Sequence, residues 1–374
     1  MQRSSALLTL AVSLAVNSSC SSDASSKGSD SSPVLLVTDS IHIRDPSADP
    51  FGRLGDFLPL ESSGYLLVDA QNTRLLEYDA RGSLVRQIGR KGSGPGELQH
   101  TGPIAVDGDS VLYILDSPTL HVFDFRTGAF RRKGTLRAPF GTSIVVTGPH
   151  LYFRAFDSTQ VPRFAAWRNG TVVLGPSLPS LSELETVKAA GAGATALMMN
   201  TTHAGAVFAP ISGDTIAVLS QASEDIVLTN LRGILGRIPV ARAQRNGVLP
   251  DLIAQVAKDP TIAQRDPLLL YAPSVPGAIT RGAGVHYLTV KTDFAFVRDH
   301  FSGKLYLSVT GPVTGLTCPD ARVPGPEDPP PSIALRGDTL FVLSQTIQES
   351  HAVTVLRKYL VQTANCKWTR TGAA

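Results

Sequence analysis

The sequence predicts an all-β fold made of repeated units of short antiparallel strands. The first observation behind this prediction is a run of three apolar strands at residues 64–88, with turn residues between them and a glycine-rich exit at 89–96. The second is that an apolar strand of the same kind recurs along the chain, and repeats decide architecture before other signals do. We count six copies, which include Tyr65, Leu112, Leu151, Ile216, Tyr287 and Leu340.

The first unit shows the plan of each repeat. Tyr65–Asp69 is a short, continuous apolar run closed by a turn former, which fits a strand buried on both faces. A second strand follows at 75–78 and a third at 84–88. The turn between these two is Asp79–Gly82, where we expect a positive φ at Gly82 because glycine has no Cβ.

Two nearly identical segments set the expected size of a repeat. Residues 213–221 (GDTIAVLSQ) and 337–345 (GDTLFVLSQ) lie 337 − 213 = 124 positions apart. We interpret this distance as three units of about 41 residues, the length of a four-stranded propeller blade.

The first two repeats resemble a known class of proteins. The segments Val68–Asp69, Asp79–Gly82 and Gly89–Leu98 resemble the motifs of the NHL-repeat class of six-bladed β-propellers. The resemblance implies four-stranded antiparallel blades around a central channel, here over residues 34–374. It implies no particular activity, because this fold carries many functions.

The expected blades follow from the copies of the apolar strand. They span residues 51–89, 103–136, 143–175, 207–240, 277–309 and 332–370. A propeller must close its ring, so we expect Val34–Ile43 to join the last blade as an outer strand beside Val353–Val361.

Two connections are longer than a turn between blades requires. One contains the capping-box pattern Ser182-x-x-Glu185, which predicts a short helix at 183–190. The other has Pro250 before an apolar pattern of helical spacing that ends at Pro260. We expect both helices over one mouth of the channel, where function on a rigid scaffold usually lies.

Composition excludes some partners. The formal net charge of +3 is too small and too spread to favour nucleic acid. Aromatic residues make up 6% of the chain, which argues against a stacking platform for carbohydrate or single strands.

The amino terminus predicts export. Residues 1–20 have a basic start and a short apolar segment, which is typical of a secretory signal peptide. Cys20, followed by a serine-rich tether at 21–33, resembles a bacterial lipoprotein processing site, although Asn17 departs from that pattern. The alternative is an ordinary cleaved signal with an incidental cysteine. We expect a protein of the cell envelope or a secreted protein, with the membrane contacted only through the lipid.

Cys318 and Cys366 are the remaining cysteines, and after export they face an oxidising compartment. We place Cys318 in the linker before the last blade, so that a bridge to Cys366 would clamp that blade. The alternative is two isolated thiols.

Candidate site residues lie at or just after the ends of the expected second strands or, for His100 and His203, before an innermost strand. We expect Asp69, Asn72, Arg74, His100, Asp116 and His203 at the channel mouth as binding residues. Asp69, Asp116 and Asp157 are either carboxylates for acid–base work or calcium binding, or turn caps. His100 and His203 could together hold a divalent metal, and otherwise are hydrogen-bonded loop histidines. Gly89–Glu97 lacks the context of a phosphate loop and is interpreted as a turn between blades.

These observations favour a binding module. We expect a monomeric, exported propeller that binds an unknown protein, peptide or small molecule at the channel mouth, without a cofactor and without an assigned catalytic residue. The alternative is a metal-dependent lyase or lactonase-like hydrolase that uses the same mouth.

Overall fold

We describe the protein from a computed structural model. The described residues are 32–44, 50–52, 54–62, 64–116, 118–136, 143–159, 161–178, 206–220, 225–240, 274–282, 286–297, 300–311, 316–326, 331–348 and 351–370. All of them lie in one compact unit, Ser31–Ala374.

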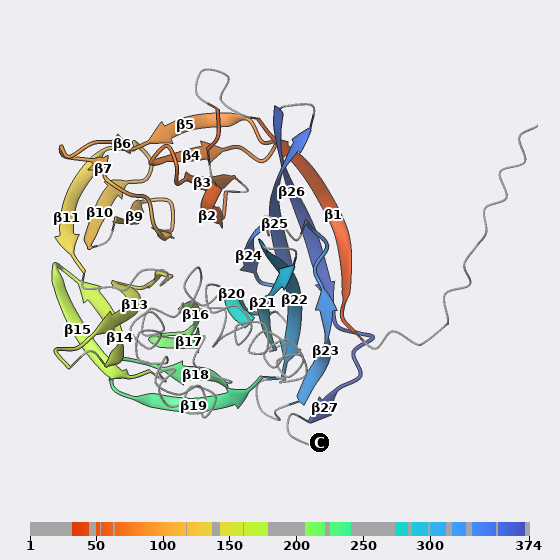
Figure 1. The fold of residues 1–374 in the computed structure, drawn as a ribbon. Coiled ribbons are helices and arrows are strands. Elements are labelled where there is room, and N and C mark those ends of the chain that lie inside the picture. Colours follow the sequence, from red (N-terminus) through yellow and green to blue (C-terminus); the bar gives the residue numbers. More distant parts are fainter. Residues whose placement is uncertain are drawn as a thin grey trace, which may run out of the picture. The chain divides into compact units, whose positions relative to one another are not determined.

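The unit is a six-bladed β-propeller, as the sequence predicts (Figure 1). Each blade is an antiparallel sheet of four strands, and blade five carries a fifth short strand. From the innermost strand outward, blade one contains β2 (Leu54–Pro59), β3 (Tyr65–Asp69), β4 (Arg74–Tyr78) and β5 (Leu84–Ile88). Blade two contains β8 (Ile104–Asp107), β9 (Val111–Asp116), β10 (Thr119–Asp124) and β11 (Phe130–Thr135). Blade three contains β12 (Val145–Thr147), β13 (His150–Phe156), β14 (Pro162–Arg168) and β15 (Thr171–Ser177).

The other three blades follow the same order. Blade four contains β16 (Ala206–Ser212), β17 (Thr215–Ser220), β18 (Asp225–Thr229) and β19 (Ile234–Pro239). Blade five contains β20 (Ser274–Arg281), β21 (Tyr287–Val297), β22 (His300–Thr310), β23 (Leu316–Arg322) and β27 (Thr369–Arg370). Blade six contains β24 (Ser332–Arg336), β25 (Thr339–Gln348), β26 (His351–Gln362) and β1 (Val34–Ile43). The six copies that the sequence reveals are the second strands of the six blades.

The core lies between blades. β3 explains why the second strands are continuously apolar: Leu66 and Val68 pack against blade two, while Tyr65 and Leu67 pack against blade six. Successive side chains point to opposite faces of a sheet, and both faces are covered here. Each of the six buried clusters joins two neighbouring blades, so together they close the ring.

The predicted closure by the amino-terminal strand is confirmed. β1 pairs antiparallel with β26, from Val34 opposite Gln362 to Ile43 opposite Thr354. Blade six is therefore built from both ends of the domain, which ties the ring shut.

The structure corrects three details. Cys318 lies within β23 of blade five, not in a linker, because blade five extends to Arg322. The segment at 369–370 pairs with β23 and so belongs to blade five rather than blade six. The repeated segments at 213–221 and 337–345 are two blades apart, not three, because a long connection separates blades four and five.

Tight turns join the first and second strands of blades two, three, four and six. Each has a glycine with φ of 51–56° at the first loop position. The loops of blades three, four and six have two residues, for which a hairpin requires a positive φ, and the loop of blade two has three, residues 108–110. The predicted positive φ at Gly82 is also confirmed, at 77°. A second reason for glycine there is space, since a Cβ would lie 2.3 Å from the His42 carbonyl oxygen of β1.

The helices expected at 183–190 and after Pro250 lie outside the described residues. Over the ranges given above the structure has strands and turns but no helix, and thus none with the length and apolar character needed to cross a bilayer.

Candidate functional site

The second and fourth strands of each blade end on the same side of the ring, which we call the loop face. The fourth strands β15 and β19, which precede residues 179–205 and 241–273 in the sequence, end on this face. Asp69, Asp116 and Asp157 lie here, at the end of the second strands of blades one to three. We call the opposite side the hairpin face.

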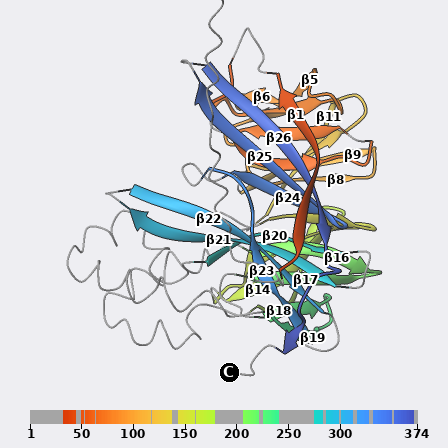
Figure 2. The same cartoon turned by 90° about the vertical axis from the view of Figure 1, so that its right-hand side faces the viewer.

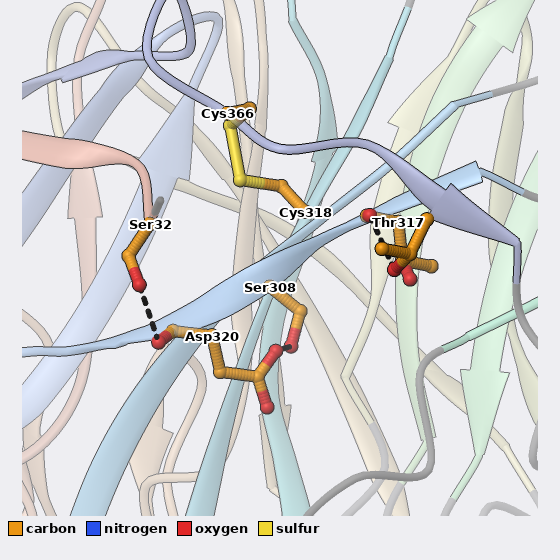
Figure 3. The surroundings of a disulfide bond; sticks show 7 residues. Ser32, Ser308, Thr317, Cys318, Asp320 and Cys366 are labelled. Carbon is orange, nitrogen blue, oxygen red and sulfur yellow. Dashed lines mark hydrogen bonds between the residues drawn. A yellow bond between two sulfur atoms is a disulfide. The ribbon is translucent and has the colours of Figure 1, made fainter. Parts of the chain in front are cut away.

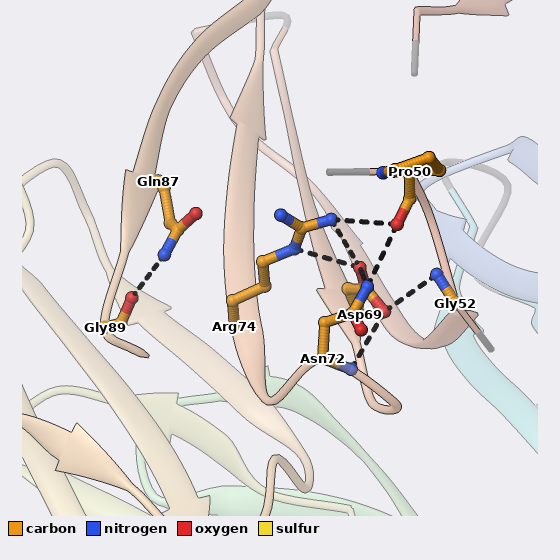
Figure 4. Close-up of polar contacts among 7 residues, drawn as sticks. All are labelled: Pro50, Gly52, Asp69, Asn72, Arg74, Gln87 and Gly89. Atoms are coloured by element: carbon orange, nitrogen blue, oxygen red, sulfur yellow. Dashed lines mark hydrogen bonds and ion pairs between the residues drawn. The ribbon is translucent and has the colours of Figure 1, made fainter. Parts of the chain in front are cut away.

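Asp69 is the centre of a buried polar network (Figure 4). Its carboxylate accepts hydrogen bonds from the backbone N–H groups of Gly52 and Asn72, at 3.3 Å each, and pairs with the Arg74 guanidinium at 2.9 Å. Asn72 and Arg74 also donate to the Pro50 carbonyl. The network therefore fixes the segment that enters blade one to the turn between β3 and β4.

Asp116 plays the same part in blade two. It accepts hydrogen bonds from the N–H groups of Gln99 and His100, at 2.7 and 2.9 Å, and lies 3.6 Å from Nε2 of the buried His121. Burial lowers the pKa of His121, opposed by the Asp116 carboxylate and reinforced by Lys133. The His100 side chain, in contrast, is 81% exposed, so Asp116 fixes its backbone and leaves its imidazole open to solvent.

Asp157 repeats the arrangement in blade three. Its carboxylate accepts from the hydroxyl of Thr159, the guanidinium of Arg163 and the N–H of Val161. These bonds hold the pKa of Asp157 well below its usual range. All three aspartates thus combine turn capping with a basic partner on the next strand, a pairing that the sequence analysis did not recognise.

The geometry favours the turn-cap interpretation of these aspartates. The carboxylates bind N–H groups and basic side chains of their own blades, and Asp69 is fully buried. Across the described ranges no three His, Cys, Asp or Glu side chains gather closely enough to hold a metal ion. His203, the proposed partner of His100, lies outside those ranges.

The glycine-rich segment 89–97 forms a compact loop closed by the parallel pair β6 (Arg90–Lys91) and β7 (Glu97–Leu98). The Glu97 carboxylate accepts a hydrogen bond from the Gly94 N–H at 2.8 Å and pairs with Arg90. These bonds lower the pKa of Glu97. The loop thus already holds an anion of its own, in keeping with a structural turn.

Asp56 is a candidate functional residue that the sequence did not reveal. It lies on the innermost strand β2 and is exposed to solvent. Its carboxylate accepts hydrogen bonds from the N–H groups of Ile104 and Phe57. The protein around this solvent-accessible carboxyl still limits its hydration and raises the pKa of Asp56, although both hydrogen bonds oppose this effect. No motif marks Asp56, because its environment arises from the neighbouring blade.

The sequence also did not reveal that two of the hairpins are unusually long. β21–β22 and β25–β26 have strands of 10–12 residues, against 5–7 for the second and third strands of the other blades. Figure 2 shows both hairpins extending beyond the remaining strands. The pairing of β20 stops at Asp293 and that of β1 at Thr354. The paired segments 294–297 with 300–303, and 346–348 with 351–353, therefore continue past their neighbours by about 10–13 Å. The absence of glycine and proline from 286–302 is the signal that could have revealed the first hairpin.

A groove of about 360 Å³ opens on the hairpin face between blades one and two. Its lining includes Asp109, Phe125 and Arg126. The Arg86 guanidinium pairs with Glu77, donates to the carbonyls of Phe125 and Arg126, and so fixes this wall.

Fold and site together define a six-bladed β-propeller with a braced loop face. A family model described as a 6-bladed beta-propeller (DUF5128) matches residues 57–176, and no curated protein matches the chain. Among solved structures, a member of the DUF4221 family from Bacteroides vulgatus is similar, with a TM-score of 0.57, 8% identity, and coverage of 90% of this chain and 100% of the other.

A Bacteroides fragilis protein described as exported has a TM-score of 0.52, 13% identity, and coverage of 88% of this chain and 96% of the other. A streptogramin B lyase reaches a TM-score of 0.49 with 12% identity, over 87% of this chain and 88% of the other. At identities this low, the two Bacteroides structures establish the shared fold alone.

Proposed function

We propose that this protein is an exported, lipid-anchored binding module whose ligand, a protein, peptide or small molecule, docks on the loop face beside the two long hairpins. The observation that carries the proposal is the pair of long hairpins β21–β22 and β25–β26, whose strands continue past the neighbouring strands of blades five and six. Among the described strands, these hairpins extend farthest on the loop face, and an uneven surface of this kind suits recognition of a partner.

The braced turns support this proposal. Asp69 and Asp116 hold the connections into blades one and two, so the loop face is fixed before a partner arrives. A preformed surface loses less conformational entropy on binding. Export is supported by the signal-like residues 1–20, and lipid attachment by Cys20 and its tether. The neighbour described as exported is consistent with this compartment.

A site-specific crosslinking experiment tests the binding face. A photoreactive amino acid replaces His100 on the loop face or, as a control, Leu235, which is 56% exposed on the outer strand β19. We expect a discrete crosslinked partner from envelope extract at His100 and none at Leu235. Equal products at both positions would contradict a site on the loop face.

Hairpin trimming provides the second arm. Replacing 294–303 with Asn-Gly joins Asp293 to its register partner Lys304, and replacing 346–353 with Asn-Gly joins Gln345 to Thr354. Both changes leave a two-residue turn that a hairpin tolerates. We expect a folded protein that no longer forms the His100 crosslink. Unchanged crosslinking after both replacements would show that the hairpins are not part of the binding site.

The second candidate is a metal-dependent lyase or hydrolase, favoured by the exposed imidazole of His100 on the same face. Elemental analysis of the purified protein and of its His100→Ala/His203→Ala variant tests this candidate. A stoichiometric divalent metal that disappears in the variant would favour the enzyme. A wild-type protein without metal would exclude this metal site.

A further inference from the structure

An exposed apolar strip lies where the tether enters the domain. Leu36 of β1 is 47% exposed and pairs with Leu360 of β26, which is 37% exposed. Val34, two residues before Leu36 on the same strand, is 40% exposed. Residues two apart lie on one face of a strand, and paired residues lie side by side. Val34, Leu36 and Leu360 therefore form one strip, which we call the tether strip.

A second feature lies close to the root of the tether. Trp368 is 39% exposed and stands between the exposed Lys367 and Arg370. Arg370 lies in β27, which pairs with Leu316–Thr317 of β23. The Ser32 hydroxyl donates to the Asp320 carbonyl of the same strand β23. Figure 3 shows Ser32, Asp320 and Cys366 together in this region. The tether root and the Trp368 segment are thus fixed to one strand.

The two features combine the residue types that membrane surfaces attract. Aliphatic side chains enter the headgroup boundary, and a tryptophan prefers the interface between lipid and water. Lys367 and Arg370 add charges that attract anionic headgroups. An exposed edge strand usually carries charges that prevent association, whereas β1 begins with the apolar run Val34–Val37.

The tether is short enough to keep this face near the membrane and long enough to let it touch the surface. Val34 follows Cys20 by 14 residues, a distance of at most about 50 Å for an extended chain. We propose that the tether strip and the Trp368 segment lie directly against the anionic lipid bilayer that holds the lipidated Cys20. This inference rests on the lipid anchor proposed above and adds a protein surface to it.

The contact would also orient the propeller. β1 is the outermost strand of blade six and lies at the rim of the ring (Figure 1). Because β1 begins at the hairpin-face end of the rim, a domain that rests on this part of its rim keeps the loop face open to partners beside the membrane.

Tryptophan fluorescence gives a direct test. The chain has two tryptophans, and the other one, Trp167, is 3% exposed in the core between blades two and three. The full-length lipidated protein is reconstituted into phosphatidylethanolamine/phosphatidylglycerol vesicles with and without brominated lipid, which quenches tryptophan at the interface. We expect the Trp368 emission to fall by about half, as a partly inserted side chain should show, and the quenching to vanish in Trp368→Phe.

Two matched double variants locate the contact. Leu36→Ser/Leu360→Ser should weaken the quenching at least about twofold, because it removes most of the strip. Ile234→Ser/Leu235→Ser changes side chains of 40% and 56% exposure on β19 of blade four and should have no effect. If the first variant fails to fold, Lys367→Glu/Arg370→Glu tests the same contact and should also reduce quenching.

Vesicle flotation separates the two ideas. Flotation together with quenching that responds to these variants supports the inference. Flotation without quenching of Trp368 overturns the proposed contact and leaves the lipid anchor intact. If the protein does not float with the vesicles, the lipid anchor is contradicted, and so is the proposed contact that depends on it.

Discussion

Asp69 and Arg74 form an ion pair in which both side chains are almost completely buried, with 2.9 Å between the carboxylate Oδ2 and the guanidinium Nη2. They are register partners at the ends of β3 and β4. Because Asp69 also binds the Gly52 N–H and Arg74 the Pro50 carbonyl, one ion pair connects the turn of blade one to the segment that follows β1.

Removing Arg74 should therefore be costly. Arg74→Met leaves the Asp69 carboxylate buried without its cation, and we expect a loss of about 3–5 kcal/mol in the free energy of unfolding. Urea unfolding measures it. Arg163→Met is the comparison, because the equivalent pair with Asp157 has an arginine that is 34% exposed and water can replace the partner. Equal losses in the two variants would contradict the role given to burial.

The disulfide between Cys318 and Cys366 should stabilise the last two blades. It closes a loop of 48 residues and ties the segment after β26 to β23 of blade five. The loop entropy in the unfolded chain corresponds to about 4 kcal/mol. We expect Cys318→Ser/Cys366→Ser to lower stability by that amount and to remove the sensitivity of the wild type to reductant. A wild-type protein indifferent to reductant would contradict this prediction.

His121 should make stability depend on pH near neutrality. Burial depresses its pKa in the folded state below the ordinary value of 6.5. The unfolded chain then binds a proton more readily, so the stabilisation present above about pH 6.5 is lost as the pH falls through the folded value. Urea titrations between pH 7.5 and 5 should show this decline in the wild type and a shallower one in His121→Gln. Parallel curves would assign the pH dependence to other groups.

The Gly89–Glu97 loop should be sensitive to both its anion and its glycines. Glu97→Ala removes the acceptor of the Gly94 N–H, and we expect faster hydrogen exchange at that amide. Gly96→Ala should destabilise the protein by about 1–3 kcal/mol, because Gly96 has a φ of 76° and a Cβ would lie 2.9 Å from the Phe130 Cβ. Unchanged exchange and stability would show that the loop is not braced as described.

Much of the fold could be predicted from local patterns. Tyr65–Val68 is a continuous apolar run, and its five counterparts are mostly apolar, because each second strand is covered on both faces, so the pattern reveals strand and burial together. Gly82 and the turn glycines mark the places where the chain reverses. The ring closure by Val34–Ile43 was predictable because the last blade lacks an outer strand unless the amino-terminal segment supplies it.

The parts that the sequence did not reveal depend on contacts between distant residues. Cys318 lies in β23 because it pairs with Val309 of β22, so blade five has a fourth strand after the predicted end of the blade at Val309. The basic partners of Asp69, Asp116 and Asp157 stand at different offsets, five or six residues away, so no single motif marks them. Asp56 acquires its surroundings from blade two, 48 residues away in the chain.

The sequence by itself determined the strands, the turns and the number of blades, because these follow from the alternation of side chains and from the φ angles that glycine permits. The tertiary structure decided which polar groups are used inside the protein and which remain open. Asp69 and His100 look alike as candidates in the sequence, yet one is buried and paired and the other is 81% exposed. That difference depends on how neighbouring blades pack, which no local pattern encodes.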